Sequence, residues 1–250
     1  MTYEVYAGGI NAVTAEVDIA YEDRDRYRLS LSAATRGFLK KLAPWQGVFF
    51  TEGWRKTDGS DRPELHKSVS FWRDEEEIKE YHYAPDGSFK AYTVVEEGEN
   101  RTPAAIDEAL TKGTTDALTA ALEVMEKVAA GQPCEGSAEV FDGRRRYRMV
   151  FSHEAEEKLE SSRYNLFEGI AARCAVEVEP LAGAWHKKPR GWMSIQEQSR
   201  ENGSLPTVWM AKMTEDAPAV PVKIRVKTDY GTLFMHLVRY ENGSVKKVLE

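Results

Sequence analysis

The sequence predicts a mainly β protein built on one large, curled antiparallel sheet, spiral or barrel-like in shape. Apolar and polar residues alternate in most segments, tight-turn motifs separate several of them, and only one long segment has a helical period. No internal repeat or low-complexity linker interrupts the chain. We therefore expect residues 1–250 to form a single β-rich domain, with a helical segment at about 101–133 between two sheet halves.

Alternation of apolar and polar residues is typical of half-buried antiparallel strands. In the first half of the chain it predicts strands at residues 3–10, 13–21, 27–35, 48–55, 64–73, 78–83 and 89–95. In the second half it predicts strands at residues 138–141, 144–151, 155–161, 170–179, 191–198, 207–213, 220–229 and 233–240. So many short strands imply a sheet that curls or closes to protect its edges.

Short turn motifs support this assignment. Pro85-Asp86-Gly87 separates two predicted strands, and Asn242-Gly243 follows the last one. Asp142-Gly143 is the strongest hairpin signal, because this dipeptide accepts the positive φ angles of a type I′ turn. Residues 38–43 form either a short helix or a loop.

Residues 114–130 have a helical period. Their apolar stripe consists of Leu118, Ala121, Leu122, Met125 and Ala129. We expect Thr114 or Thr115 to cap this helix, Asp116 to lie in its first turn, and Gly131 and Pro133 to end it. The stripe is expected to pack against the sheet as core rather than to form a cofactor groove.

The composition indicates a globular, mildly acidic protein. Hydrophobic residues make up 42% of the chain, and 34 basic against 41 acidic residues give a net charge of −7. Such a charge argues against a general nucleic-acid binder, although a local basic patch remains compatible with it. The longest apolar runs contain only a few residues, so no transmembrane segment is expected.

The two cysteines, Cys134 and Cys174, are 40 positions apart. In an oxidising compartment an even pair suggests one disulfide. Two buried free thiols are the alternative, and the spacing alone leaves both open.

Several short segments resemble a known family. They are Asp142-Gly143-Arg144-Arg145-Arg146-Tyr147, Asp116-Ala117-Leu118-Thr119-Ala120-Ala121-Leu122 and the ending Pro221-Val222-Lys223-Ile224-Arg225-Val226-Lys227-Thr228-Asp229-Tyr230-Gly231-Thr232-Leu233. The opening Tyr3-Glu4-Val5-Tyr6-Ala7-Gly8-Gly9-Ile10 also fits the family's start. In order and spacing, these segments resemble the uncharacterised proteobacterial envelope family called domain of unknown function 3108 (DUF3108). The resemblance covers nearly the whole chain.

Members of that family are typically exported to the periplasm. The resemblance therefore implies a periplasmic protein whose signal peptide has been removed, and it favours the Cys134–Cys174 disulfide. It also implies a long spiralling or barrel-like sheet. No catalytic residues are established for the family, so none is carried over to this chain.

Three arginines are candidate anion-binding residues. Arg144, Arg146 and Arg148 alternate onto one face of the predicted hairpin. Their guanidinium groups are suited to a phosphate, a lipid headgroup or a peptide carboxylate. The alternative is a solvated strand face on which the arginines pair with neighbouring carboxylates.

The tryptophans suggest a core or a cavity. Trp54, Trp72, Trp192 and Trp209, four of the six in the chain, are candidates to line a concave apolar cavity. The alternative is that they fill the core of the curled sheet, as large aromatic rings commonly do.

Catalytic and metal-binding motifs are not evident. The five histidines are dispersed, and although His66 and His82 could meet across neighbouring strands, no third metal ligand is indicated. The sequence has neither a Gly-x-Ser-x-Gly elbow nor a phosphate-binding glycine loop. We therefore expect no metal and no cofactor, and an enzyme is the least favoured function.

Two functional hypotheses follow. The favoured one is a non-catalytic periplasmic protein that supports cell-envelope integrity by binding a protein, lipid or cell-wall partner. The alternative is a carrier that holds a lipid-like hydrophobic ligand in a cavity of the sheet.

Overall fold

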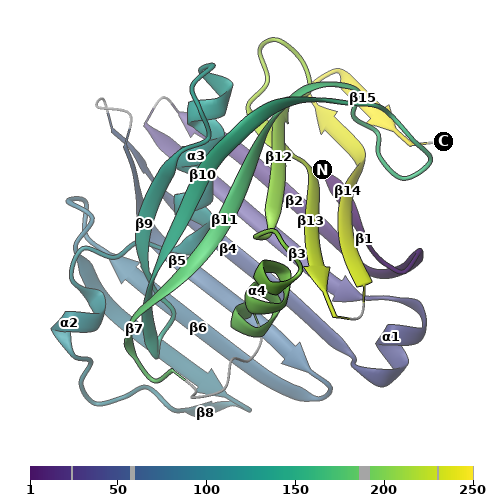
Figure 1. Ribbon diagram of the computed structural model, residues 1–250. Helices are drawn as coiled ribbons and strands as arrows, with labels where there is room; N and C mark the ends of the chain where they lie inside the picture. Colours follow the sequence, from purple (N-terminus) through teal and green to yellow (C-terminus); the bar gives the residue numbers. More distant parts are fainter. Residues whose placement is uncertain (24, 57–59, 186–191, 230, 250) are drawn as a thin grey trace.

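One antiparallel sheet dominates the molecule. The computed structural model describes residues 1–23, 25–56, 60–185, 192–229 and 231–249. Within these residues 15 strands form a single sheet in which all paired strands run antiparallel (Figure 1). The prediction of a large antiparallel sheet is confirmed.

The first group of strands is a meander in which each strand pairs with the next along the chain. Its members are β1 (Thr2–Ala7), β2 (Ile10–Asp23), β3 (Arg26–Thr35), β4 (Trp45–Arg55), β5 (Asp61–Trp72), β6 (Glu75–Tyr83), β7 (Phe89–Glu96) and β8 (Glu99–Asn100). The strand predicted at residues 3–10 ends early, at Ala7. Gly8 and Gly9 follow with φ angles of +58° and +84°, so the chain turns there instead of continuing.

The second group of strands forms the other half of the sheet. It contains β9 (Gly136–Phe141), β10 (Arg145–Leu159), β11 (Gly169–Gly183), β12 (Thr207–Lys212), β13 (Ala219–Thr228), β14 (Gly231–Asn242) and β15 (Val245–Val248). The two strands predicted at residues 144–151 and 155–161 are one strand, β10. Its register shifts between His153 and Ala155, so a bulge lies where the alternation breaks.

The two groups are joined by strands that lie far apart in sequence. β1 pairs with both β2 and β14, and Tyr3 lies opposite Leu237 in this register. Both side chains are buried, with 1% and 0% of their surface exposed. The strand order is therefore β8-β7-β6-β5-β4-β3-β2-β1-β14-β13-β12-β11-β10-β9, with β15 pairing onto β14.

The helix predicted at residues 114–130 is present as α3 (Ala117–Ala129). Its cap is Asp116 rather than a threonine: the carboxylate accepts hydrogen bonds from the N–H groups of Leu118 and Thr119, at 2.9 and 3.1 Å. Leu122 and Met125 of the predicted stripe are buried, but so is Val124. More than one face of α3 is covered because it lies between the two groups of strands (Figure 1).

Three further helices accompany α3 in the described parts of the chain. They are α1 (Gly37–Leu42), which confirms a short helix near residues 38–43, α2 (Glu108–Thr111) and α4 (Trp192–Glu201). α2 and α3 both fall in the predicted helical segment between β8 and β9.

The strand predicted at residues 191–198 is wrong from Trp192 onward, and residue 191 lies outside the described residues. The buried residues of α4, Gln196 and Ser199, are three positions apart, which is a helical spacing. The Gln196 amide exchanges hydrogen bonds with the backbone N–H and carbonyl of Val178 in β11, at 2.6 and 3.0 Å. The helix is thus held to the strand by a side chain instead of a backbone ladder.

The predicted hairpin turns are confirmed, with one change of type. Pro85-Asp86-Gly87 connects β6 to β7, and Asp142-Gly143 lies between β9 and β10. A type I′ turn requires positive φ at both central residues, whereas only Gly143, at +94°, has one in this turn. The Asp142 carboxylate stabilises the turn by accepting hydrogen bonds from the N–H groups of Arg144 and Arg145, at 3.1 and 2.8 Å.

Among the residues with described positions, three clusters of buried side chains form the core. One contains Tyr3, Trp209 and Leu237, a second packs α3 between β3 and β10–β12, and a third packs Phe141 of β9 against Tyr81 and Tyr92. The third cluster therefore joins the two ends of the sheet through side chains. Among the described strands, β8 and β9 are not hydrogen-bonded to each other, so the sheet is not a closed barrel.

None of the described helices has the length and apolar composition needed to cross a membrane.

Candidate functional site

An aromatic pocket of about 380 Å³ lies over β13, β14 and the β1–β2 turn. We call it the aromatic pocket; its lining consists of Tyr6, Gly8, Gly9, Tyr164, Lys223, Thr232, Phe234 and His236. Gly8 and Gly9 are exposed, so the pocket opens to solvent on that side. Tyr164 comes from the connection between β10 and β11.

The pairing of three strands places these side chains together. His236 of β14 lies opposite Glu4 of β1 and opposite Lys223 of β13. Phe234, two residues before His236, lies on the same face of β14 and opposite Tyr6. A period of two along each strand therefore brings aromatic rings and an ammonium group to one face of the sheet.

The rings contact one another in a continuous wall. The rings of Phe234 and His236 are stacked, with centroids 5.7 Å apart and planes inclined by 17°. His236 also stacks with Tyr164, at 6.3 Å and 21°, and Tyr164 meets Tyr6 edge-on at 4.9 Å. Such contacts hold flat apolar surfaces in fixed orientations.

Lys223 brings a positive charge to the pocket. Its ammonium nitrogen lies 4.7 Å from the centre of the Trp209 ring and 5.7 Å from that of Phe234, as in cation–π contacts. Burial lowers the pKa of Lys223, and the nearby Arg225 guanidinium acts in the same direction, while the Glu157 carboxylate opposes them. Among the residues that the structure describes, no carboxylate forms an ion pair with Lys223.

His236 is held in its neutral form. Burial, and secondly the Lys223 ammonium, lower the pKa of His236 to about 4. Its Nδ1 atom is buried and has no hydrogen-bond partner in the described part of the chain. The pocket therefore offers aromatic surface and one ammonium group, that of Lys223.

Comparison with protein families identifies the chain. Residues 2–238 of the 250 match the family described as a protein of unknown function, DUF3108. The chain belongs to the DUF3108 family. Comparisons with curated proteins and with solved structures give no match.

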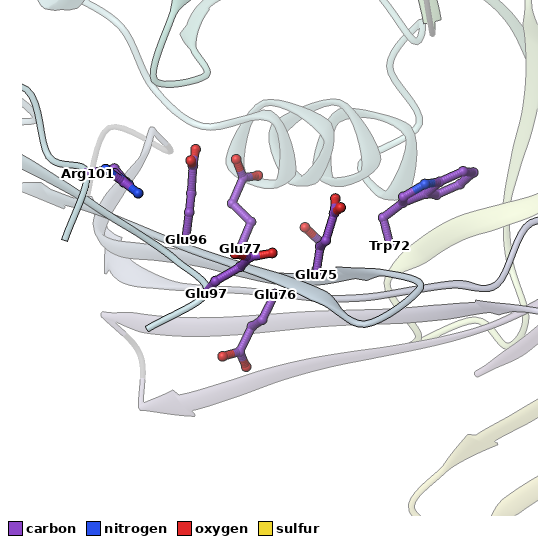
Figure 2. A pocket seen from close by; sticks show the side chains of 8 residues that line it. Trp72, Glu75, Glu76, Glu77, Glu96, Glu97 and Arg101 are labelled. Carbon is purple, nitrogen blue, oxygen red and sulfur yellow. The ribbon is translucent and has the colours of Figure 1, made fainter. Parts of the chain in front are cut away.

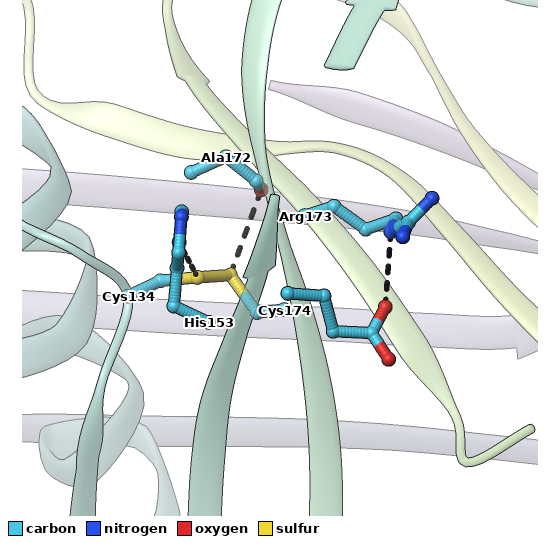
Figure 3. The surroundings of a disulfide bond; sticks show 6 residues. Cys134, His153, Ala172, Arg173 and Cys174 are labelled. Carbon is cyan, nitrogen blue, oxygen red and sulfur yellow. Dashed lines mark hydrogen bonds and ion pairs between the residues drawn. A yellow bond between two sulfur atoms is a disulfide. The ribbon is translucent and has the colours of Figure 1, made fainter. Parts of the chain in front are cut away.

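In this DUF3108 protein Cys134 and Cys174 form a disulfide, with their Cα atoms 6.1 Å apart (Figure 3). Both side chains are fully buried, and Nδ1 of His153 lies 3.3 Å from Cys134 Sγ. Cys134 precedes β9 and Cys174 lies in β11, so the bond bridges across β10. The disulfide alternative, rather than the free thiols, is the one the structure contains.

The three candidate anion-binding arginines of the DUF3108 chain all have carboxylate partners. Arg144 pairs with Glu96 at 3.2 Å, Arg146 pairs with Glu139, and Arg148 pairs with Glu139 at 3.0 Å and with Glu179 at 3.3 Å. This arrangement agrees with the alternative of a paired strand face. An anion would have to displace these carboxylates, and anion binding here stays a prediction.

The four candidate cavity tryptophans are not brought together around one cavity. Trp209 is buried in the core, with 1% of its surface exposed, whereas Trp72 and Trp192 are 48% and 41% exposed. The ring of Trp54 lies beneath the guanidinium of Arg26, at 5.3 Å. The aromatic pocket is instead formed by tyrosine, phenylalanine and histidine.

Trp72 lines a separate pocket of about 510 Å³ at the sheet edge (Figure 2). Its other lining residues are Ser70, Glu75, Glu76, Glu77, Glu96, Glu97 and Arg101. Figure 2 shows that the Glu76 side chain extends away from the other carboxylates. Glu77 pairs with Lys79 at 2.5 Å, and no group of three or more His, Cys, Asp or Glu residues in the described ranges is arranged to hold a metal ion.

The two histidines considered as metal ligands do not meet. His66 lies opposite Tyr81, and His82, the next residue on β6, points to the other face of the sheet. His186 lies outside the described residues.

A buried Thr–His–Asp group lies at the start of α3. Thr51 Oγ1 is 2.7 Å from Nδ1 of His66 and donates a hydrogen bond to Oδ1 of Asp116 at 2.9 Å. Asp116 Oδ1 is also 3.4 Å from that same nitrogen of His66. A catalytic triad places the imidazole between nucleophile and acid, with one ring nitrogen facing each. Because the threonine and the aspartate share one nitrogen and Thr51 is fully buried, this group is a structural network.

The sequence contained part of the signal for the aromatic pocket. Tyr6, Phe234 and His236 each occupy predicted strands, and the period of two places Phe234 and His236 on one face. The partner strand of β14 could not be predicted, because β1 and β14 stand at opposite ends of the chain. Tyr164 lies in a connection that has no periodic pattern.

Proposed function

We propose that this DUF3108 protein is a non-catalytic periplasmic protein that supports cell-envelope integrity by binding a partner molecule at the aromatic pocket. The partner classes are a protein, a lipid or a cell-wall component. The observation that carries the proposal is the wall of Tyr6, Tyr164, Phe234 and His236 rings beside an opening to solvent. Accessible aromatic surface of this kind favours binding of apolar groups, because water is displaced from both surfaces.

The polar groups favour binding over catalysis. His236 has no hydrogen-bonded carboxylate to orient it among the described residues, and its low pKa keeps it uncharged near pH 7. A general base is most effective with a pKa near the working pH. The Thr51–His66–Asp116 group has the wrong connectivity for a nucleophile and lies away from the aromatic pocket lining.

The disulfide supports the proposed compartment. Disulfides persist in oxidising compartments such as the periplasm and are rare in the reducing cytosol. The Cys134–Cys174 bond is fully buried and ties β11 to the segment before β9. A periplasmic location makes the cell envelope the natural source of partners.

Carriage of a lipid-like ligand is a second candidate function. It is favoured by the pocket volume of about 380 Å³, which falls within the usual range for ligand sites, roughly 300–1,000 Å³. A carrier would enclose its ligand, whereas the aromatic pocket is open beside Gly8 and Gly9. The opening favours a partner that is only partly covered.

The proposal is tested with the protein exported to the periplasm and purified without denaturant. Native mass spectrometry would detect a co-purified molecule, and calorimetric titration with 1-octanol would measure apolar binding directly. We expect binding to the unaltered protein and to the control Phe38→Ala, and loss of it in Phe234→Ala. Phe38 is a suitable control because it is 68% exposed on α1 and does not line the pocket.

Equal binding by Phe234→Ala and Phe38→Ala would contradict the assignment of the pocket. A bound molecule fully shielded from solvent exchange would favour the carrier instead.

A further inference from the structure

The aromatic pocket differs in charge from other pockets of the molecule. Four other pockets within the described part of the chain each have two or more carboxylates in their lining. The aromatic pocket has none, although the protein carries a net charge of −7. Its lining contains one ammonium group, that of Lys223.

Two acidic residues that could pair with Lys223, Glu157 and Glu4, contact other groups instead. Glu157, which interacts electrostatically with Lys223, pairs with Arg173 at 3.0 Å. Glu4, opposite His236 in register, accepts a hydrogen bond from the hydroxyl of Tyr6. Another charged neighbour, Arg225, is itself a cation and donates to Thr207 Oγ1 at 3.3 Å. Lys223 therefore keeps its positive charge available to the pocket.

The surroundings of the ammonium group strengthen any contact with an anion. Lys223 lies against the rings of Trp209 and Phe234, which exclude water from one side of it. An ion pair is stronger where water is excluded than at an open surface. Hydrogen bonds between charged groups are also about twice as strong as those between neutral groups.

The rest of the pocket is apolar and suits a hydrocarbon body. Phe234, His236 and Tyr164 form a stacked wall, and the opening beside Gly8 and Gly9 leaves room for a chain to extend outward. The same ligand can thus bury carbon atoms against the rings while its charged end meets the lysine.

We propose that the aromatic pocket binds an amphiphilic anion, a carboxylate or phosphate carried on an acyl chain, with the Lys223 ammonium as the partner of the anion. This inference rests on the proposed function, and it names the chemical class of the ligand. Of the partner classes above, it selects a lipid or a fatty acid.

The test compares a charged probe with its neutral counterpart. Calorimetric titrations with octanoate and with 1-octanol are carried out on the unaltered protein, on Lys223→Met and on the control Lys227→Met. Methionine keeps the apolar stem of lysine and removes only its charge. Lys227 is a matched control because it lies on the same face of β13, and its ammonium donates to the Asn202 carbonyl at 3.0 Å, outside the pocket.

We expect Lys223→Met to bind octanoate at least about tenfold more weakly than the unaltered protein, which corresponds to the loss of one charged hydrogen bond. Binding of 1-octanol should change less than threefold, and Lys227→Met should resemble the unaltered protein for both probes. Lys223→Arg retains the charge and should retain the preference for octanoate. A parallel titration with dihexanoyl phosphatidate distinguishes a phosphate from a carboxylate as the better headgroup.

The outcomes separate this inference from the proposed function. If 1-octanol and octanoate both bind but Lys223→Met binds octanoate as tightly as the unaltered protein, the role of Lys223 is refuted and the pocket remains. If none of the three probes binds, the pocket is not the binding site and the proposed function fails with it.

Discussion

Removal of the Cys134–Cys174 disulfide provides a stringent test of the fold. The bond closes a loop of 40 residues. In the chain-entropy treatment, a loop of that length restricts the unfolded chain enough to stabilise the native state by about 4 kcal/mol. For a chain of this size each kcal/mol corresponds to roughly 2–4 °C in Tm, so we expect the double variant Cys134→Ala/Cys174→Ala to melt about 8–16 °C lower.

Equilibrium unfolding in urea, followed by tryptophan fluorescence, measures this effect. The oxidised protein, the same protein unfolded and refolded with reductant, and the double alanine variant are compared at one pH. The reduced protein and the variant should have similar midpoints, both well below that of the oxidised protein, and reductant should not affect the variant. A free energy of unfolding that differs by less than about 1 kcal/mol between the oxidised protein and the variant would refute the argument.

Three other predictions concern single positions. Asp116→Ala removes the cap of α3 and the acceptor of two buried threonine hydroxyls. We therefore expect the free energy of unfolding, measured in urea, to decrease by about 3 kcal/mol, and a decrease below about 1 kcal/mol would contradict the role of this network. Gly53→Ala would place a Cβ atom 2.1 Å from a backbone carbonyl oxygen of the neighbouring strand and should cost about 3 kcal/mol. Gly136→Ala should be nearly neutral, because its Cβ would meet a flexible lysine end at 3.3 Å and a valine methyl group at an ordinary contact distance of 3.5 Å. Burial, together with the Lys223 ammonium, lowers the pKa of His236 to about 4 in the folded state, so between that value and the unfolded value of about 6.5 only the unfolded chain binds the proton. Above about pH 6.5 neither state binds the proton, so His236 does not lower the free energy of unfolding; as the pH falls from about 6.5 toward about 4, the free energy of unfolding decreases. In His236→Phe this decrease should be smaller by about 1 kcal/mol. Equal slopes of unfolding free energy against pH in the two proteins would show that His236 is not the group responsible.

Most of the strands could be predicted because each needs only local information. A half-buried antiparallel strand shows its two faces in its own alternation of residues, and turn dipeptides such as Asp142-Gly143 mark its ends. The prediction of a strand at residues 191–198, where the structure has α4, was wrong because it used the same local information. Its buried polar residues, Gln196 and Ser199, are satisfied by contacts with β11 and β13, which nothing in residues 192–201 indicates.

The candidate site could be predicted only in part. The aromatic residues of β1 and β14 are visible in the sequence, but their meeting depends on a pairing between the two ends of the chain. Lys223 looked like one of many strand lysines, since its lack of a carboxylate partner depends on where Glu4 and Glu157 find theirs. The tryptophans were misleading because ring size indicates burial but does not indicate which rings share a cavity.

The placement of β1 beside β14 has a consequence for how the protein folds. The meander from β1 to β7 can form as soon as its own residues are available, because each of its strands pairs with the next. Until β14 arrives, however, β1 presents a free row of backbone donors and acceptors, and Tyr3 lacks the side chain of Leu237 that covers it. We therefore expect the pairing of β1 with β14 to be a long-range step in assembly, since its closure brings together residues from opposite ends of the chain.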